Sequence, residues 1–367
     1  MHSGNVFMSD KHAALAGHIR RLCSLGVEPR LVIPHVIEAA RQIVGADWGM
    51  FFYADECHVL TDVYSENDAV YTVLPAYFAN VHNTPQQEVL GVTFSDAMRR
   101  GRGFDNSARH DGALLSSAMY ADLWQPVSMR HCLELTATDG TRGWGSLQLS
   151  RSPGSPPFSE KHHRDLEPFA RHLAHALSRP VQPPLHEAEG SLSAIVVVDA
   201  AGRILLHNAD SIRMLALATG EPLAFYRDDR VPDWLAPLLT NAGRIWRGHP
   251  APPATLERRT TAGRFRFKAY RFADAGAMRR EFAIVIYIEH FPPLELEIER
   301  LGFRLGLTER QRELCTQLVL GRSHSEIARC LALRDSTVVD HVRKIHRKLD
   351  VHNHDELRSV FRLGAQG

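Results

Sequence analysis

Hydrophobic residues recur at helix and strand spacing through residues 28–178, which predicts one domain of mixed α and β structure. The stretch opens and closes on amphipathic helices, and the closing helix is expected to start near Ser159. A short amphipathic helix around Lys11 to Leu25, within residues 1–27, is expected to precede this domain. Between the two longer helices we expect strands at Trp48–Tyr53, Val59–Tyr64, His131–Thr136 and Gly143–Leu149.

A proline-rich linker, residues 179–190, separates this domain from a second, smaller one at residues 191–290. Helices are expected after Asn208 and at Pro232–Trp246. Strands are expected at Ala194–Val198, Arg203–His207, Arg264–Phe272 and Phe282–Glu289. The pattern predicts a second α/β (α+β) domain, with a hairpin between its first two strands.

The remaining part of the chain shows helical periodicity only. A connector helix is expected in residues 291–303, after the Pro292–Pro293 break, and an all-α domain in residues 304–367. Thr308 and Ser323 are predicted N-caps, and Glu326 completes a capping box with Ser323. Four helices are expected in the last domain, at Glu309–Leu320, Ser323–Leu331, Ser336–Leu349 and from Asn353 through Phe361.

The third of these helices has an apolar stripe and a basic opposite side. The apolar residues recur at 4-3-4 spacing and are expected to be buried: Val338, Val342, Ile345 and Leu349. The opposite side presents Val339, Asp340, Arg343, Lys344 and Arg347. A helix of this kind has the size to enter the major groove of DNA.

Charge is distributed unevenly along a chain whose formal net charge is only +1. Residues 304–367 hold 12 lysines and arginines against eight acidic residues, a local charge of +4. The other 303 residues therefore carry a net charge of −3. A basic end on a near-neutral body indicates that nucleic-acid binding is confined to that end.

Cysteine and histidine usage suggests no metal site. The five cysteines are odd in number and form no C-x-x-C pair, which predicts a reduced, cytoplasmic protein. The pairs His162–His163 and His352-x-His354 lack the further ligands that a metal site needs. The N-terminus has no signal-peptide pattern, and the apolar runs are too short to cross a membrane.

The C-terminal pattern resembles the LuxR/NarL-type helix-turn-helix family across about 55 residues. The matching residues are Leu307-Thr308, Glu313, Gly321, Glu326-Ile327-Ala328, Leu331, Thr337-Val338, His341, Ile345, Lys348-Leu349 and Val351. The resemblance implies a transcription regulator that binds double-stranded DNA, acts as a homodimer and has RNA polymerase as a candidate partner. The DNA-contacting residues it implies are Thr337, Val339, Asp340, His341, Arg343, Lys344, Arg347 and Lys348.

The expected contacts differ in kind. Arg343 is expected to read a guanine, whereas Lys344, Arg347 and Lys348 are expected to meet phosphates. Val339 and Asp340 stand where many relatives have lysine and a small polar residue, which predicts a changed operator preference.

Three further positions depart from the family pattern. Gln311 stands where the family commonly has glutamate, and Asp350 stands where it commonly has glycine. Arg334 stands where the family commonly has a serine or aspartate that caps the helix. The loss of the capping residue predicts that Asp335 replaces Arg334 as the N-cap.

The two upstream domains resemble known sensory modules. Residues 28–178 resemble a GAF domain through Gly143–Leu149 and Ser155–Glu160, and residues 191–290 resemble a PAS domain through Ala194–Asp199, Gly202-Arg203 and Asn208. Both families have antiparallel sheets flanked by helices, and they bind small molecules or mediate dimerisation. A small-molecule effector is expected against the first sheet, and its candidate contacts are Phe51, Tyr53, Trp124, Met129 and Cys132. The alternative is that these five residues only pack in the core.

Two other functions compete with that of a ligand-controlled regulator. In the first, the upstream domains bind no ligand and serve only dimerisation. In the second, the chain is an enzyme with an appended DNA-binding domain. The chain has no phosphate-binding glycine loop and no G-x-S-x-G nucleophile elbow, so we expect no enzyme. The sequence does not identify a cofactor.

Overall fold

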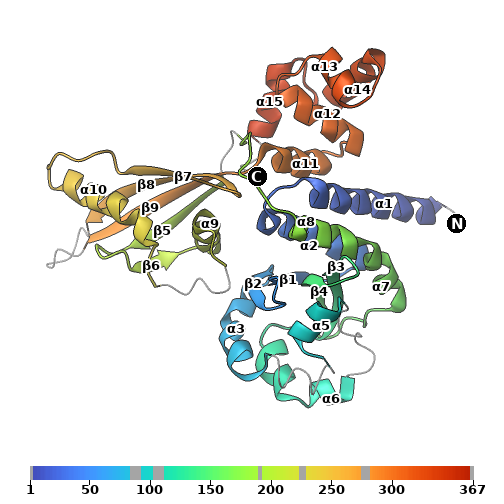
Figure 1. Cartoon of the computed structure of the whole chain (residues 1–367), viewed down its shortest axis with the longest axis horizontal. Coiled ribbons are helices and arrows are strands. Elements are labelled where there is room, and N and C mark those ends of the chain that lie inside the picture. The colour runs from blue at the N-terminus through green and yellow to red at the C-terminus, as the bar shows by residue number, and fades with distance from the viewer. Residues whose placement is uncertain are drawn as a thin grey trace. The chain divides into compact units, whose positions relative to one another are not determined.

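The structure is a computed structural model that describes residues 3–82, 92–101, 111–188, 192–222, 229–273 and 282–363 (Figure 1). The chain divides into two compact units, residues 1–181 and 182–367. None of the described helices is both long and apolar enough to cross a bilayer.

The first unit is built on a four-stranded antiparallel sheet with strand order β2-β1-β4-β3. The strands are β1 (Trp48–Ala54), β2 (Leu60–Ser65), β3 (His131–Thr138) and β4 (Gly143–Arg151). The helices and turns are α1 (Ser3–Ser24), α2 (Pro29–Val44), α3 (Ala69–Asn80), α5 (Phe94–Arg100), α6 (Asp111–Leu115), η1 (Tyr120–Trp124), α7 (Glu160–Leu166), η2 (Glu167–Phe169) and α8 (Ala170–Ser178).

Helices cover both faces of this sheet (Figure 1). Helices α2 and α8 lie on one face, and α3 and α5 lie on the other, with α6 farther from the sheet and against η1. Gly49 lets α2 approach closely, because a Cβ atom there would lie 2.5 Å from Cγ2 of Ile37. On the second face the ring of Phe52 packs against Tyr77 and Phe94.

The four predicted strands of this unit are present, but the helices between β2 and β3 were not expected. Proline inside α3 and the shortness of α5 and α6 hide their periodicity. Helix α1 is also longer than expected, because the apolar residues of its first turns, Val6–Met8, are consecutive and show no helical spacing.

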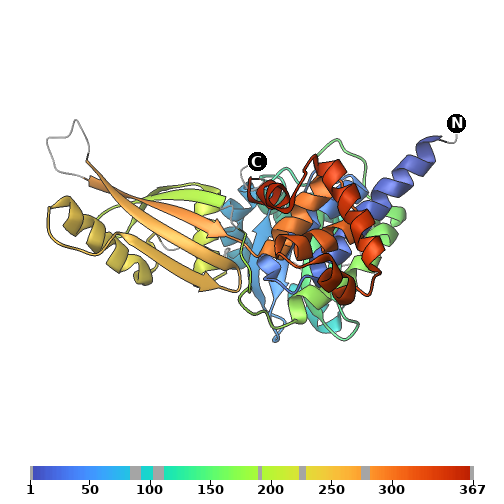
Figure 2. The same cartoon turned by 90° about the horizontal axis from the view of Figure 1, so that it is seen from above.

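The second unit contains a five-stranded antiparallel sheet with strand order β6-β5-β9-β8-β7. The long strands β8 and β9 run side by side and twist together (Figure 2). The elements are β5 (Leu192–Val198), β6 (Ile204–His207), α9 (Ala209–Thr219), η3 (Asp233–Leu235), α10 (Ala236–Trp246), β7 (Thr255–Thr260), β8 (Gly263–Ala273) and β9 (Phe282–Phe291).

Strand β7 was not predicted, because its sequence, Thr-Leu-Glu-Arg-Arg-Thr, lacks a hydrophobic run. It is an edge strand that pairs with β8 only, so tertiary pairing and not local propensity decides its conformation. The polar side chains also suit an exposed sheet edge.

Helices α9 and α10 pack on the inner face of the second sheet, where Trp234 meets Phe267 edge-on at 5.1 Å between ring centroids. The outer face, defined by register, has an apolar part that extends from β6 and β5 to the C-terminal end of β8. Four of its side chains are each at least 47% exposed: Ile195, Leu206, Tyr270 and Phe272. We call these four residues the open apolar face.

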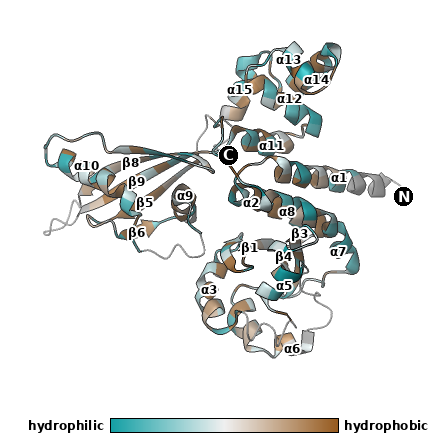
Figure 3. Cartoon of the chain, in the orientation of Figure 1, coloured by the Kyte–Doolittle hydropathy of each residue, from teal (hydrophilic) through white to brown (hydrophobic). Residues whose placement is uncertain are grey.

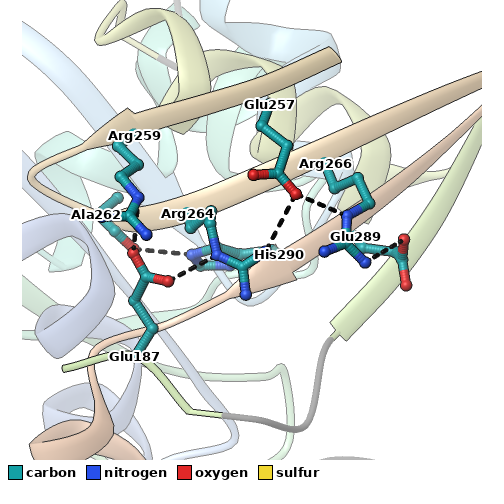
Figure 4. Close-up of polar contacts among 8 residues, drawn as sticks. All are labelled: Glu187, Glu257, Arg259, Ala262, Arg264, Arg266, Glu289 and His290. Carbon is teal, nitrogen blue, oxygen red and sulfur yellow. Dashed lines mark hydrogen bonds and ion pairs between the residues drawn. The ribbon is translucent and has the colours of Figure 1, made fainter. Parts of the chain in front are cut away.

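Opposite charges tie the start of the second unit to the β7–β8 hairpin (Figure 4). Glu187 pairs with Arg264 at 2.6 Å and with Arg259 at 3.5 Å. Glu257 pairs with Arg266 at 2.8 Å and with Arg264 at 3.3 Å. The hydrogen bond from Arg266 is the main cause that lowers the pKa of Glu257.

His290 lies buried beside this network. Its Nε2 atom is 2.8 Å from the carbonyl oxygen of Ala262 (Figure 4). Its ring stacks on Phe265, with 4.3 Å between the ring centroids. Burial lowers the pKa of His290 to about 4. The imidazole is therefore neutral at pH 7 and donates from Nε2 to the carbonyl.

The chain continues as five helices that share one core. They are α11 (Leu294–Arg304), α12 (Glu309–Val319), α13 (His324–Cys330), α14 (Asp335–Leu349) and α15 (His354–Leu363). These helices carry both hydrophilic and hydrophobic residues (Figure 3). Leu294 and Ile298 of α11 belong to the same buried cluster as Leu314, Ile327 and Val338. The helix expected as a connector is thus packed into the C-terminal core.

Candidate nucleic-acid interface

Local capping determines where α12 and α13 begin. Thr308 and Gln311 exchange hydrogen bonds between side chain and backbone, and Ser323 and Glu326 do the same. Each such box satisfies two backbone N–H groups at a helix N-terminus. The predicted capping box at Ser323 is confirmed, and Gln311 fills the role of the glutamate that is common in the family.

The start of α14 differs from the prediction. Arg334 occupies the N-cap position without a side-chain hydrogen bond, and Asp335 is the first helical residue. The Asp335 carboxylate instead accepts a hydrogen bond from the Ser325 hydroxyl at 2.9 Å. The prediction that Asp335 is the N-cap is therefore wrong, because a tertiary contact to α13 holds its side chain. A carboxylate in the first turn still interacts favourably with the helix dipole.

The apolar stripe of α14 holds this helix firmly on the core. Val338, Val342 and Ile345 are buried, and Leu349 is partly buried. They pack with residues of α12, α13 and α15, which fixes the rotation of α14 about its own axis. The orientation of its outer side is therefore determined by the core.

Four of the eight predicted DNA-contacting residues lie exposed on the outer side of α14: Asp340, Arg343, Lys344 and Arg347. The exposed hydroxyl of Ser336, which the sequence reading did not single out, falls on the same side by helical spacing. Asp340 and Arg343 lie 3.8 Å apart as an exposed ion pair, so the Arg343 guanidinium gains little from it and stays available to another acceptor.

The other four predicted residues are placed differently. Thr337, Val339 and His341 are half-buried at the edges of the outer side. Lys348 is exposed, but its ammonium group donates to the carbonyl oxygen of Gly306, before α12. Lys348 therefore joins the end of α14 to the α11–α12 turn, a role that its position in the sequence did not reveal.

A buried ion pair joins α11 to α12. Arg312 Nε lies 2.9 Å from Glu299 Oε1, and the two side chains are only 5% and 2% exposed. Arg312 also donates to the Leu307 carbonyl oxygen at 2.6 Å. Gly302 leaves room for this arginine, since a Cβ atom there would lie 3.0 Å from Arg312 Cγ. Helix α11 therefore packs into the same core as α12–α15.

The five candidate ligand residues of the first unit do not meet on one surface. By register, Phe51 and Tyr53 lie on the α2 side of the sheet, whereas Cys132 lies on the α3 and α5 side. Met129 is buried in the loop before β3, and Trp124 packs against a small cluster with Leu123. The alternation of strand side chains separates residues that the resemblance to a GAF sheet had grouped together.

Comparison with known families gives the last helices a clear relationship. Residues 305–361 match the family described as bacterial regulatory proteins, luxR family. These residues form a LuxR-type helix-turn-helix domain. A curated relative, the putative HTH-type transcriptional regulator YhjB of Escherichia coli (strain K12), is 34% identical over 60 residues. That match spans 16% of this chain and 30% of YhjB, so it covers little beyond the LuxR-type domain.

Solved structures with some similarity include the VqmA dimer of Vibrio cholerae without target DNA, with 16% identity and a TM-score of 0.19. The match covers 46% of this chain and 81% of that one. A sensor region of a sensor histidine kinase is 9% identical with a TM-score of 0.18, over 68% of this chain and 90% of that one. Such low TM-scores assign no fold to the part of the chain that precedes the LuxR-type domain.

Proposed function

We propose that this chain is a sequence-specific DNA-binding transcription regulator in which α14 enters the major groove. The observation that carries the proposal is an exposed basic side of α14 on a buried apolar stripe, within a LuxR-type domain. Arg343 is proposed to contact a base, and Lys344 and Arg347 to contact phosphates. Thr337, Val339 and His341 line the edges of the contact.

Fluorescence anisotropy with labelled duplex DNA tests this proposal. Lys344→Ala is expected to weaken binding for all sequences and to reduce the slope of log affinity against log salt by about 1. Lys161→Ala, which removes an exposed lysine from α7, is the matched control and is expected to change neither quantity. An unchanged slope in Lys344→Ala would reject the proposed phosphate contact.

We further propose that the chain acts as a dimer. The open apolar face of the second sheet supports this proposal, because monomeric proteins seldom expose contiguous apolar surface. Sedimentation of Ile195→Lys is expected to show a smaller species than the wild-type chain. Leu185→Lys changes an apolar residue that is 93% exposed outside this face, and it is expected to leave the oligomeric state unchanged.

We propose that the two regions before the LuxR-type domain, residues 28–178 and 191–290, supply the regulatory signal as a GAF-like and a PAS-like sensory domain. Each of these two regions has an antiparallel sheet with flanking helices, which supports this proposal. Native mass spectrometry together with an absorption spectrum of the purified chain tests it. A retained small molecule would support sensing, whereas ligand-free protein with full DNA binding and no response to metabolite pools would favour a purely dimerising role.

A further inference from the structure

A stripe of polar side chains runs along the α3 and α5 side of the first sheet. Antiparallel register places three cross-strand pairs of β3 and β4 on this side, namely Cys132–Ser150, Glu134–Gln148 and Thr136–Ser146. We call these six residues the polar stripe. At a rise of about 3.3 Å per residue the stripe is about 13 Å long, the length of a small organic molecule.

The polar stripe is enclosed, which is unusual for so many polar groups. Thr136, Ser146 and Ser150 are 5%, 0% and 1% exposed. Helix α5 lies against one end, because a Cβ atom on Gly143 would come within 3.0 Å of both Met98 and Thr136. Glu134 and Gln148, in the middle, keep partial exposure. Helix α5 therefore closes one end of the stripe, and solvent reaches the stripe at its centre.

Two hydroxyls of the polar stripe have no hydrogen-bond partner among the residues that the structure describes. These are Thr136 Oγ1 and Ser150 Oγ, one toward each end. Ser146, by contrast, donates to Oε1 of Glu134. Buried hydroxyls almost always have partners in folded proteins. Two such hydroxyls on one sheet face indicate a partner from outside the described residues.

The stripe is also close to electrically neutral. Burial raises the pKa of the Glu134 carboxyl to about 8, against the opposing effect of the hydrogen bond from Ser146. Burial raises the pKa of the Cys132 thiol as well. At neutral pH the carboxyl is therefore mostly protonated and can donate a hydrogen bond. A charged ligand would lose its hydration here without meeting a fixed opposite charge within the stripe.

We propose that the polar stripe binds an uncharged small molecule whose carbonyl or hydroxyl oxygens accept hydrogen bonds from Thr136, Ser150 and Glu134. This inference rests on the proposed sensory role of the first unit and names the chemical class of its effector. Neighbouring Phe52, on the same side by register with Ser146, offers an apolar wall for the carbon skeleton.

Ligand-observed saturation-transfer NMR on the full chain tests the proposal with three five-membered-ring probes. They are 2-pyrrolidinone, which is neutral, pyrrolidine, which is cationic at pH 7, and cyclopentanecarboxylate, which is anionic. We expect transfer to 2-pyrrolidinone. A ring of this size reaches one end of the stripe at a time, so its binding is expected to be at least fivefold weaker in Thr136→Val or in Ser150→Ala. Thr255→Val, which removes a hydroxyl from an exposed position on β7, is the matched control and should bind like wild type.

The thermal stability of the two variants separates a ligand contact from a structural role. Removal of an unpartnered buried hydroxyl should leave the melting temperature unchanged or raise it. Transfer that is equal in all variants, restricted to a charged probe or absent for all three would overturn the proposal, as would a lowered melting temperature in both variants. DNA binding measured on the same samples reports separately on the proposed function.

Discussion

The ion pair between Glu299 and Arg312 makes a quantitative prediction about the rigidity of α11 on the helix-turn-helix domain. The pair is almost completely buried, with 2.9 Å between Arg312 Nε and Glu299 Oε1. Glu299→Gln keeps the volume and one acceptor oxygen but leaves the arginine charge without compensation. Removing one member of a buried pair costs about 3–5 kcal/mol, and we take about 3 because the amide oxygen still presents its dipole to the guanidinium.

Hydrogen exchange of the full chain, followed by mass spectrometry, measures this loss in peptides of α11 and α12. A loss of about 3 kcal/mol corresponds to exchange about 100-fold faster, since 1.36 kcal/mol is a factor of ten. Asp355→Asn is the control, because that carboxylate is 93% exposed and 3.7 Å from Arg358. Its effect is expected to stay below about fivefold.

A double substitution separates charge burial from packing. In Glu299→Met with Arg312→Leu both charges are gone, and replacing a whole buried pair by apolar groups is often neutral. Part of the protection is therefore expected to return, short of the full value because the Leu307 carbonyl loses its donor. If hydrogen exchange in α11 were slower or unchanged in Glu299→Gln, or changed only as much as in Asp355→Asn, α11 would not be held on the helix-turn-helix domain by this ion pair.

Three further changes test other features. Asp350 ends α14 in a left-handed conformation, with φ 53° and ψ 48°, so Asp350→Gly should stabilise the domain by about 1 kcal/mol, and a lower melting temperature would contradict this. The pKa of His290 is lowered to about 4, so as the pH falls the unfolded chain takes up a proton at this histidine before the folded chain does. The contribution of His290 to the free energy of unfolding is therefore complete above pH 6.5, and the free energy of unfolding falls by up to about 3 kcal/mol toward pH 4. His290→Gln should flatten that dependence in exchange rates corrected for pH, and an equally steep dependence would refute it. Asp340→Ala should change base preference in a randomised-site selection, whereas an identical preference would show that Asp340 reads no base.

Short-range sequence patterns were enough to predict much of the secondary structure of this protein. The capping residues of α12 and α13 and the apolar stripe of α14 act within one helix or turn, so the sequence was enough to predict them. The strands of both sheets were predicted for the same reason, except β7, whose pairing with β8 compensates for its polar composition. The LuxR-type module was readable because its spacing is continuous along the chain.

Tertiary structure alone decided the contacts between distant residues. Lys348 bonds to Gly306, and Asp335 bonds to Ser325 rather than capping α14, and neither partner is a neighbour in sequence. Register likewise placed Cys132 opposite Ser150 and on the other side of the sheet from Phe51. A shift by one residue would reverse the face of every strand side chain, and register depends on packing across the whole unit. Hence the sequence identified the helix that we propose to bind DNA, while the polar stripe appeared only in the folded sheet.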